Sequence, residues 1–316
     1  MRWAASQICT MLGALRPAIF TRRASVSMSA LMLRPARLGL CCGLLLICTP
    51  LAHASSAEHR TRDNSDVPPT VREQLANNEE PALTVHEPMY FLVGGHSGDD
   101  LTARIQLSFK YRLFDPEMVD GNGFAWLTNV HFAYTQESLW DLSEDSYPFR
   151  DTVHRPSIFW ERARITDKNQ ANILRVGLEH ESNGEDEEAS RSIDTLFIQP
   201  GFATDVFERE LILAPKFYAY LVTGSHNRDV DRYRGYGDFV VRYGNDDSWV
   251  AQVAYRYGIG GNHTGQLDVS IPIRPRIFGR TGAYIYFQVF EGYGETLLDY
   301  NRRTPLTARV GFAIVR

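Results

Sequence analysis

A histidine, a serine and an aspartate lie within fifteen residues of one another, at His180, Ser182 and Asp194. A base, a hydroxyl nucleophile and a carboxylate are the three groups that many hydrolases combine for acyl transfer. A His-x-Ser pair alone is common in strands, where it usually packs or is solvated without doing chemistry. The Asn183-Gly184 turn signal directly after the serine, and the carboxylate that returns at Asp194, make this set more specific. We therefore take the three residues as candidate catalytic groups.

The spacing also predicts which way these side chains point. Alternate residues of a strand face the same side, so His180 and Ser182 continue the face of the residues before them, and Asp194 shares the face of its own strand. These faces carry Leu174, Val176 and Leu178 on the first strand and Ser190, Ser192, Leu196 and Ile198 on the second. Two neighbouring strands would thus present the three groups on an apolar side. If that side faces lipid, the nucleophile is delivered to lipid.

The string from His180 to Asp194 resembles the signature of the outer-membrane phospholipase A family, His-x-Ser-Asn-Gly, a short loop and then Ser-Arg-Ser-x-Asn. The stretch 134–150 resembles the family's second strand and following loop, and 292–301 resembles its last hairpin. The resemblance covers roughly residues 100 to 316. It implies a twelve-stranded barrel that hydrolyses acyl esters of phospholipids, with A1, A2 and lysophospholipase activity.

The same resemblance implies roles for the candidate residues. Ser182 would attack the ester carbonyl, His180 would act as base and then acid, and Asp194 would orient the imidazole where the family usually has Asn. The backbone N–H of Gly184 would stabilise the oxyanion. Asp194 also has a plainer interpretation, as a solvated carboxylate at the edge of a loop.

Calcium is the cofactor that the resemblance implies, bound between two subunits. Its ligands would be the backbone carbonyl of Glu185, the hydroxyl of Ser190 and Ser146 of the partner copy. The acidic run at 185–188 suits a hard cation with oxygen ligands. The alternative is that this run is simply an acidic surface loop.

Gln136 is the candidate dimer contact. It shares strand parity with Phe132 and Tyr134, and an amide on a lipid face is costly unless it finds a partner. A symmetric dimer supplies that partner, and the resemblance implies reversible homodimerisation through a glutamine at this position. The alternative is that Gln136 lies at the water interface and needs no partner.

The first 54 residues predict a secretory signal peptide. They contain six Arg and no Asp or Glu, and an apolar core from Leu38 to Thr49 leads to an A-x-A site at 52–54. All four cysteines lie in this segment. Its removal leaves 27 basic residues against 38 acidic ones, a net charge of −11, which argues against a nucleic-acid partner. Residues 55–100 are predicted to be a polar periplasmic segment, and residues 101–316 the barrel.

No apolar run of about 20 residues follows residue 54, which excludes a helical membrane protein and leaves a closed barrel as the membrane fold. The resemblance implies that this barrel lies in the bacterial outer membrane. The pattern predicts an all-β, antiparallel transmembrane barrel, the resemblance implies that it has about twelve strands, and a soluble β-sandwich is the alternative. Pro215 and Pro272 are expected near strand ends. Eleven strands are predicted, and one more would complete the barrel: 105–113, 124–134, 155–165, 172–182, 190–199, 209–222, 236–244, 248–257, 265–273, 282–291 and 305–315.

A non-enzymatic barrel, either a porin or a structural anchor, remains the alternative function. A porin needs a wide lumen, whereas about twelve strands leave a lumen that side chains can fill. Lipid hydrolysis and single-channel conductance are the measurements that separate the two.

Overall fold

The computed structural model describes residues 81–96, 101–119, 123–167, 170–273 and 282–316. The predicted signal peptide, and most of the predicted periplasmic segment, lie outside the described residues.

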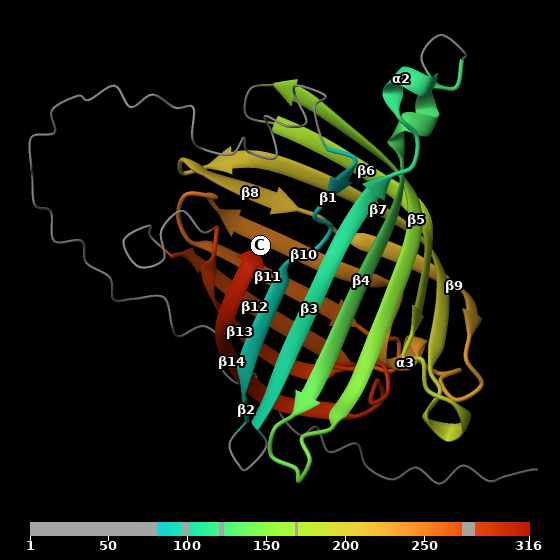
Figure 1. Ribbon diagram of the computed structural model, residues 1–316, viewed down its shortest axis with the longest axis vertical. Coiled ribbons are helices and arrows are strands. Elements are labelled where there is room, and N and C mark those ends of the chain that lie inside the picture. The colour runs from blue at the N-terminus through green and yellow to red at the C-terminus, as the bar shows by residue number, and fades with distance from the viewer. Residues whose placement is uncertain (1–80, 97–100, 120–122, 168–169, 274–281) are drawn as a thin grey trace, which may run out of the picture. The chain divides into compact units, whose positions relative to one another are not determined.

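The described chain forms a closed antiparallel β-barrel of twelve strands, and successive strands pair with each other around the wall (Figure 1). The last strand pairs with the first, which closes the ladder. Closure leaves no unpaired strand edge, as an apolar solvent requires. The strands are β2 (Met89–Gly95), β3 (Leu101–Arg112), β4 (Val130–Asp141), β5 (Phe149–Asp167), β6 (Gln170–Ser182), β7 (Ser192–Val206), β8 (Arg209–Leu213) with β9 (Lys216–Thr223), β10 (Gly237–Gly244), β11 (Val250–Tyr257), β12 (His263–Pro272), β13 (Tyr284–Tyr293) and β14 (Arg303–Val315).

One wall strand is interrupted by a proline. β8 and β9 both pair with β7 on one side and β10 on the other, so together they make a single strand broken at Ala214 and Pro215. Pro215 has no N–H to give to the ladder, whereas Ala214 N–H still donates to Val240 O at 2.9 Å. Pro272 is the last residue of β12, so both prolines lie at strand ends as predicted.

Several predicted boundaries are wrong: β4 and β7 continue to Asp141 and Val206, well past residues 134 and 199, and β5 begins at Phe149 and not at residue 155. The barrel does not begin at residue 101, because β2 (Met89–Gly95) is a wall strand that pairs with β14 and β3. This is the twelfth strand. Sequence analysis missed it because its seven residues, MYFLVGG, are too few to show a clear alternation beside the polar segment that precedes them. The strand predicted at 124–134 begins only at Val130, because residues 125–129 form a 3₁₀ turn. The two-residue strand β1 (Leu83–Thr84) pairs with β3 beyond the end of β2.

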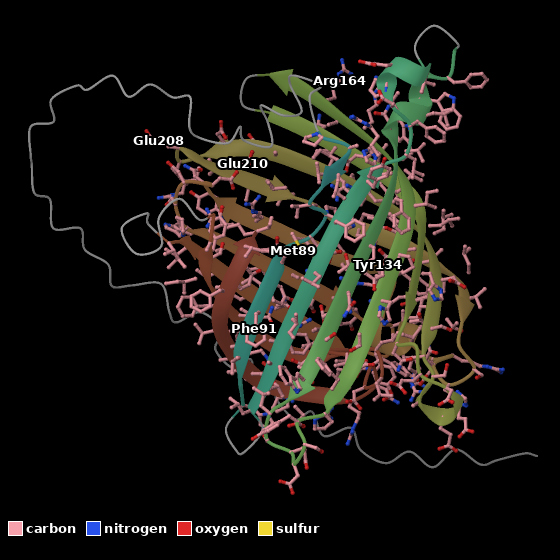
Figure 2. All side chains as sticks on the ribbon, in the orientation of Figure 1. Met89, Phe91, Tyr134, Arg164, Glu208 and Glu210 are labelled. Atoms are coloured by element: carbon pink, nitrogen blue, oxygen red, sulfur yellow. The ribbon has the colours of Figure 1, made fainter. Side chains whose placement is uncertain are left out.

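The outer surface of the barrel is apolar, as the alternation predicted. Phe91 on β2, which Figure 2 labels, is 43% exposed, and Leu107 on β3 and Ile158 on β5 are 51% and 46% exposed. Among the residues that the structure describes, no helix is both long and apolar enough to cross a membrane.

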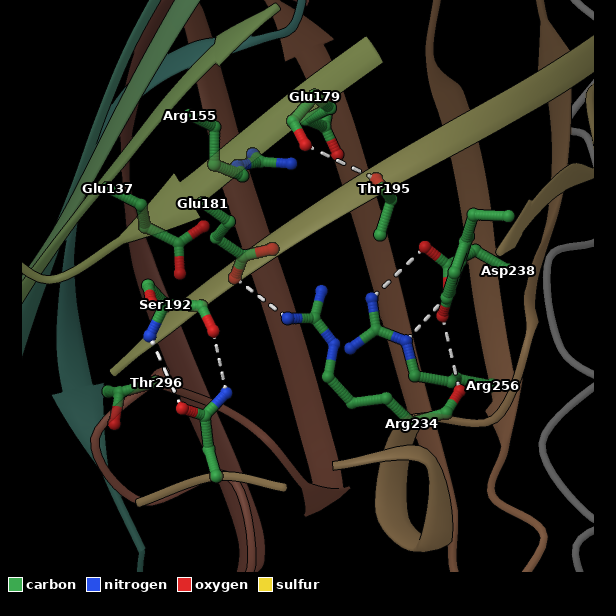
Figure 3. A network of polar contacts seen from close by, with 12 residues as sticks. Glu137, Arg155, Glu179, Glu181, Ser192, Thr195, Arg234, Asp238, Arg256 and Thr296 are labelled. Atoms are coloured by element: carbon green, nitrogen blue, oxygen red, sulfur yellow. Dashed lines mark hydrogen bonds and ion pairs between the residues drawn. The ribbon is translucent and has the colours of Figure 1, made fainter. Parts of the chain in front are cut away.

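The lumen is filled with paired charges. A cavity of about 400 Å³ remains inside the wall. Around it, Glu181 on β6 accepts a hydrogen bond from Arg234 at 2.8 Å, and Asp238 on β10 accepts two from Arg256 at 2.6 and 3.1 Å (Figure 3). Further pairs are Arg104–Glu137, Lys110–Glu161, Arg155–Glu87 and Lys216–Glu179.

Two short α-helices in the described part of the chain lie near opposite ends of the barrel (Figure 1). They are α2 (Pro116–Val119) and α3 (Asp231–Arg234). At the α3 end, loop residues pack against wall residues in a buried apolar group that we call the end cluster: Val153, Ile193, Val230, Leu297 and Tyr300. The loops therefore cover this end of the lumen with their own hydrophobic contacts.

The pairing of Arg234 predicts a stability effect. Burial alone would lower the pKa of Arg234, but the Glu181 carboxylate holds that pKa well above its usual value, so the guanidinium stays charged. Glu181→Ala therefore leaves a buried cation unpaired and should lower the free energy of unfolding by on the order of 3 kcal/mol. Arg302→Ala, which breaks an exposed pair with Asp299, should change it by less than about 1 kcal/mol. Urea unfolding in detergent, followed by heat-modifiable gel mobility, measures both, and equal effects would contradict the argument.

Candidate functional site

The candidate site lies where β6 ends and β7 begins. These strands pair antiparallel with His180 directly opposite Asp194 and Ser182 opposite Ser192. Their outward residues, among them Leu178 and Leu196, are 48% and 46% exposed. Because His180, Ser182 and Asp194 share this parity, all three lie on the outer surface, as the sequence predicted.

His180 and Asp194 are joined by a hydrogen bond. The Nδ1 atom of His180 lies 2.6 Å from Oδ1 of Asp194, and the two side chains are 45% and 43% exposed. A carboxylate at Nδ1 selects the tautomer in which Nε2 carries the free lone pair, which is what a general base requires. Among the described residues, no hydrogen bond joins His180 to Ser182, which lies two residues further along the same face. His180 and Asp194 are thus joined across the two strands, and Ser182 lies on the same face two residues from His180.

The loop after Ser182 is organised by a buried asparagine. Asn183 Nδ2 donates to Ala189 O at 2.9 Å, while its Oδ1 accepts the N–H of Arg191 at 2.9 Å. Gly184 follows with φ of +69°, a conformation that glycine adopts without strain. The Asn-Gly signal therefore marks a longer loop across residues 183–191 and not a two-residue hairpin. Sequence reasoning used Asn183 as a turn signal and missed that its side chain holds the loop together.

Arg191 links this loop to the end cluster. Its guanidinium donates to Glu188 O at 2.6 Å and Ser190 O at 3.0 Å, and it lies 6.0 Å from the ring centroid of Tyr300. The acidic side chains at 185–188 remain exposed. The loop thus exposes its carboxylates to water, while hydrogen bonds from the side chains of Asn183 and Arg191 hold its backbone.

Asn227, a residue without any sequence signal, fixes the first residue of β7. Its fully buried side chain accepts the N–H of Ser192 at 3.3 Å and donates to Ser192 O at 2.9 Å (Figure 3). Gly224 allows this approach, because a Cβ there would lie 2.4 Å from Asn227 Oδ1. Ser192 is thereby held opposite Ser182, and Asp194 follows two residues later.

Gln136 belongs to a polar row on the same outer surface. Register places it opposite His154 on β5, and His154 lies opposite Ser182 on β6. The hydroxyl of Tyr134 lies 2.7 Å from His154 Nδ1 and 3.3 Å from Gln136 Oε1. Gln136 Nε2 also donates weakly to Ser138 Oγ at 3.5 Å. The half-buried amide therefore lies close to polar groups of its own chain, and Gln136 stays a predicted dimer contact.

The three predicted calcium ligands are not gathered within one chain. Ser190 and Glu185 lie in the loop that Asn183 organises, whereas Ser146 is exposed in the β4–β5 loop, where its hydroxyl donates to Asp145 O. No contact joins Ser146 to the other two among the described residues. The same part of the chain contains no group of three or more His, Cys, Asp or Glu that could hold a metal ion.

Known proteins resemble this chain both in sequence and in fold. Phospholipase A1 of Escherichia coli K12 is 32% identical over 180 residues, which cover 54% of this chain and 56% of the relative. That of Klebsiella pneumoniae is 33% identical over 180 residues, 54% of this chain and 57% of the relative. The chain thus spans little more than half the length of these curated relatives.

Two solved structures share the fold. Outer membrane phospholipase A from Escherichia coli superimposes with a TM-score of 0.61 at 23% identity, over 75% of this chain and 99% of that one. The Salmonella typhi outer membrane phospholipase dimer with bound calcium gives 0.64 at 22% identity, over 78% and 99%. These likenesses show the β-barrel fold, and the apolar outer surface of this barrel is what a membrane-spanning barrel requires.

The sequence match extends well beyond the site and includes strand β2, which pattern reasoning overlooked. The family model for phospholipase A1 matches residues 70–315, which is most of the chain. The protein therefore belongs to the phospholipase A1 family.

Proposed function

We propose that this protein is an outer-membrane phospholipase that hydrolyses acyl esters of phospholipids with a Ser182–His180–Asp194 mechanism. The observation that carries the proposal is the position of the His180–Asp194 pair beside Ser182 on the apolar outer face. A site facing outward meets the acyl ester of a membrane lipid, which a lumenal site would not reach. The lumen itself is occupied by ion-paired side chains, which does not favour a passive porin.

Each residue has a defined part in this mechanism. Ser182 Oγ attacks the ester carbonyl carbon, and His180 Nε2 takes its proton and returns it to the leaving alcohol. Asp194 keeps the imidazole in the required tautomer and stabilises the imidazolium. The N–H of Gly184 donates to the carbonyl oxygen as charge develops on it. Water then releases the acyl group from Ser182 by the same steps. Acyl esters at either glycerol position of a phospholipid, and lysophospholipids, are candidate substrates.

The donor groups of the loop fit calcium by their chemistry. A backbone carbonyl at Glu185 and a hydroxyl at Ser190 are hard oxygen ligands, and the exposed acidic run adds attraction for a cation. Ser146 would complete the set from a second copy of the chain. A bound calcium ion supplies electrostatic stabilisation of negative charge at the reacting ester. We propose calcium dependence and reversible homodimerisation together, because the ligand set is incomplete in one chain.

The first test removes the nucleophile and the base. Ser182→Ala and His180→Ala should each lower fatty acid release from mixed micelles by at least about 10³-fold, since neither group can be replaced by water. Both residues lie on the outer surface, so the barrel should still fold, as heat-modifiable gel mobility reports. Leu178→Ala, two residues before His180 on the same face, is the matched control and should remain active. Wild-type turnover in Ser182→Ala would remove the proposed mechanism.

A graded series tests the role of Asp194. Asp194→Asn should keep substantial activity because its amide oxygen can still accept the N–H of His180 Nδ1, whereas Asp194→Ala should lose more because the imidazole is no longer oriented. Steady-state rates at saturating lipid compare the two. If Asn is as damaging as Ala, the negative charge is essential and orientation is not its main contribution.

Dilution tests the dimer. In calcium-containing detergent, Gln136→Ala should weaken dimerisation, because it removes an outward amide that a two-fold axis could bring to a partner. Activity should then fall most at low protein concentration, with monomer folding unchanged. Crosslinking and activity across a dilution series measure both, and chelation of calcium in the wild type should produce the same shift. Superimposable curves for mutant and wild type would show that Gln136 has no part in assembly.

A further inference from the structure

A second histidine lies beside the proposed nucleophile. His154 is on the outer face of β5, paired with Gln136 on β4 and with Ser182 on β6. It is therefore at the same level of the barrel wall as Ser182, one strand away. Neither the motif around His180 nor the predicted strand at 155–165 included it.

Tyr134 holds one side of the His154 imidazole. The Tyr134 hydroxyl lies 2.7 Å from His154 Nδ1, and the two rings stack with centroids 6.2 Å apart and an interplanar angle of 27°. The two nitrogens of an imidazole point in nearly opposite directions. With Nδ1 directed toward β4, Nε2 is directed toward β6.

The position of Gly184 agrees with this orientation. A methyl group built on Gly184 would lie 3.9 Å from His154 Cδ2, the ring carbon bonded to Nε2. His154 thus borders Gly184, whose N–H is the proposed oxyanion donor. The Nε2 side of the ring is thus next to Gly184, and His154 lies opposite Ser182 in the ladder.

We assign the single proton of the Tyr134 hydroxyl to the shorter of its two contacts, and this assignment fixes the tautomer of His154. The tyrosine hydroxyl has one proton, and its contact with His154 Nδ1, at 2.7 Å, is shorter than its contact with Gln136 Oε1, at 3.3 Å. Donation to Nδ1 leaves the imidazole proton on Nε2. Among the described residues, no acceptor lies within hydrogen-bond distance of that N–H, and an unpaired donor on an apolar face is costly.

We propose that His154 Nε2–H is a second donor to the carbonyl oxygen of the acyl ester, beside the N–H of Gly184. When Ser182 Oγ bonds to the carbonyl carbon, its proton passes to His180 Nε2, and the carbonyl π electron pair moves onto the oxygen. His154 donates a hydrogen bond to that oxygen and neither gains nor loses a proton. This inference rests on the proposed esterase function and adds a catalytic residue to it.

The test compares two substitutions of His154. His154→Phe keeps a planar ring but removes the donor, and should lower kcat by about 10²-fold while KM changes by less than about threefold. His154→Gln places an amide N–H near the former Nε2 and should recover much of the loss. Ile158→Phe, four residues along the same face, is the matched control and should equal the wild type. All rates are measured at protein concentrations where crosslinking shows complete dimer, because Tyr134 also contacts Gln136.

A second measurement does not depend on lipid turnover. A long-chain alkyl fluorophosphonate should label Ser182 more slowly in His154→Phe than in His154→Gln or the wild type, because its P=O oxygen occupies the place of the oxyanion. Unchanged kcat and labelling in folded His154→Phe would overturn the inference. Equal losses in the Phe and Gln variants would also overturn it, because the donor would then not be the relevant group.

The design separates this inference from the proposed function. If the wild type neither releases fatty acid nor labels at Ser182, the esterase proposal itself fails. If His154→Phe does not fold, Tyr134→Phe decides, because it keeps the aromatic ring and removes the hydroxyl that selects the tautomer. It should lower kcat by roughly fivefold to tenfold, since a misoriented donor loses part of its effect. A wild-type kcat in that variant would count against His154 as a donor.

Discussion

Closure of the antiparallel ladder is the constraint on which everything else in this protein depends. A lipid environment offers no hydrogen bonds to the backbone, so each wall strand must pair on both sides, from β2 through to β14. Once the ladder is closed, every wall residue has two possible directions, outward or into the lumen. The side chains then follow the period of the strand. A site on the outside of this fold therefore requires polar side chains at outward positions that would otherwise carry apolar side chains.

The wall accommodates charge by keeping nearly all of it inside. Glu181 points into the lumen, where Arg234 binds it, whereas its neighbours His180 and Ser182 point out. One strand thus contributes both to an internal ion-pair network and to the proposed catalytic site on the outer surface. The outer polar groups are arranged so that each compensates another: His180 with Asp194, and Tyr134 with His154. This limits the cost of placing them beside hydrocarbon.

The loops at the α3 end fix the positions of the site residues more closely than the strands alone would. Asn183 closes the loop after β6, and Asn227 holds the backbone of Ser192 through two hydrogen bonds. Arg191 connects the first of these loops to Tyr300 in the end cluster. Three buried or half-buried polar side chains therefore position a site whose reactive groups are exposed. A firm support behind an open site is what substrate delivered from a membrane would require.

The strand period and the motif were readable from the residues alone. Alternation placed His180, Ser182 and Asp194 on one outer face, because the two-residue period of a strand follows directly from backbone geometry. It also located eleven of the twelve wall strands. It overlooked β2, since a seven-residue strand beside polar residues has too few alternations to stand out, and it began β4 too early, since the aromatic residues before Val130 continue the pattern into a 3₁₀ turn.

Register and the long-range contacts were decided only by the tertiary structure. Nothing in the local sequence states that His154 lies opposite Ser182, because the pairing of β5 with β6 is set by the whole ladder and by the turns that join its strands. Asn227 reaches Ser192 across 35 residues of sequence, a separation at which no periodic signal survives. Sequence thus determined which residues face outward. Their neighbours on that face, and the groups that hold them from behind, depended on closing the barrel.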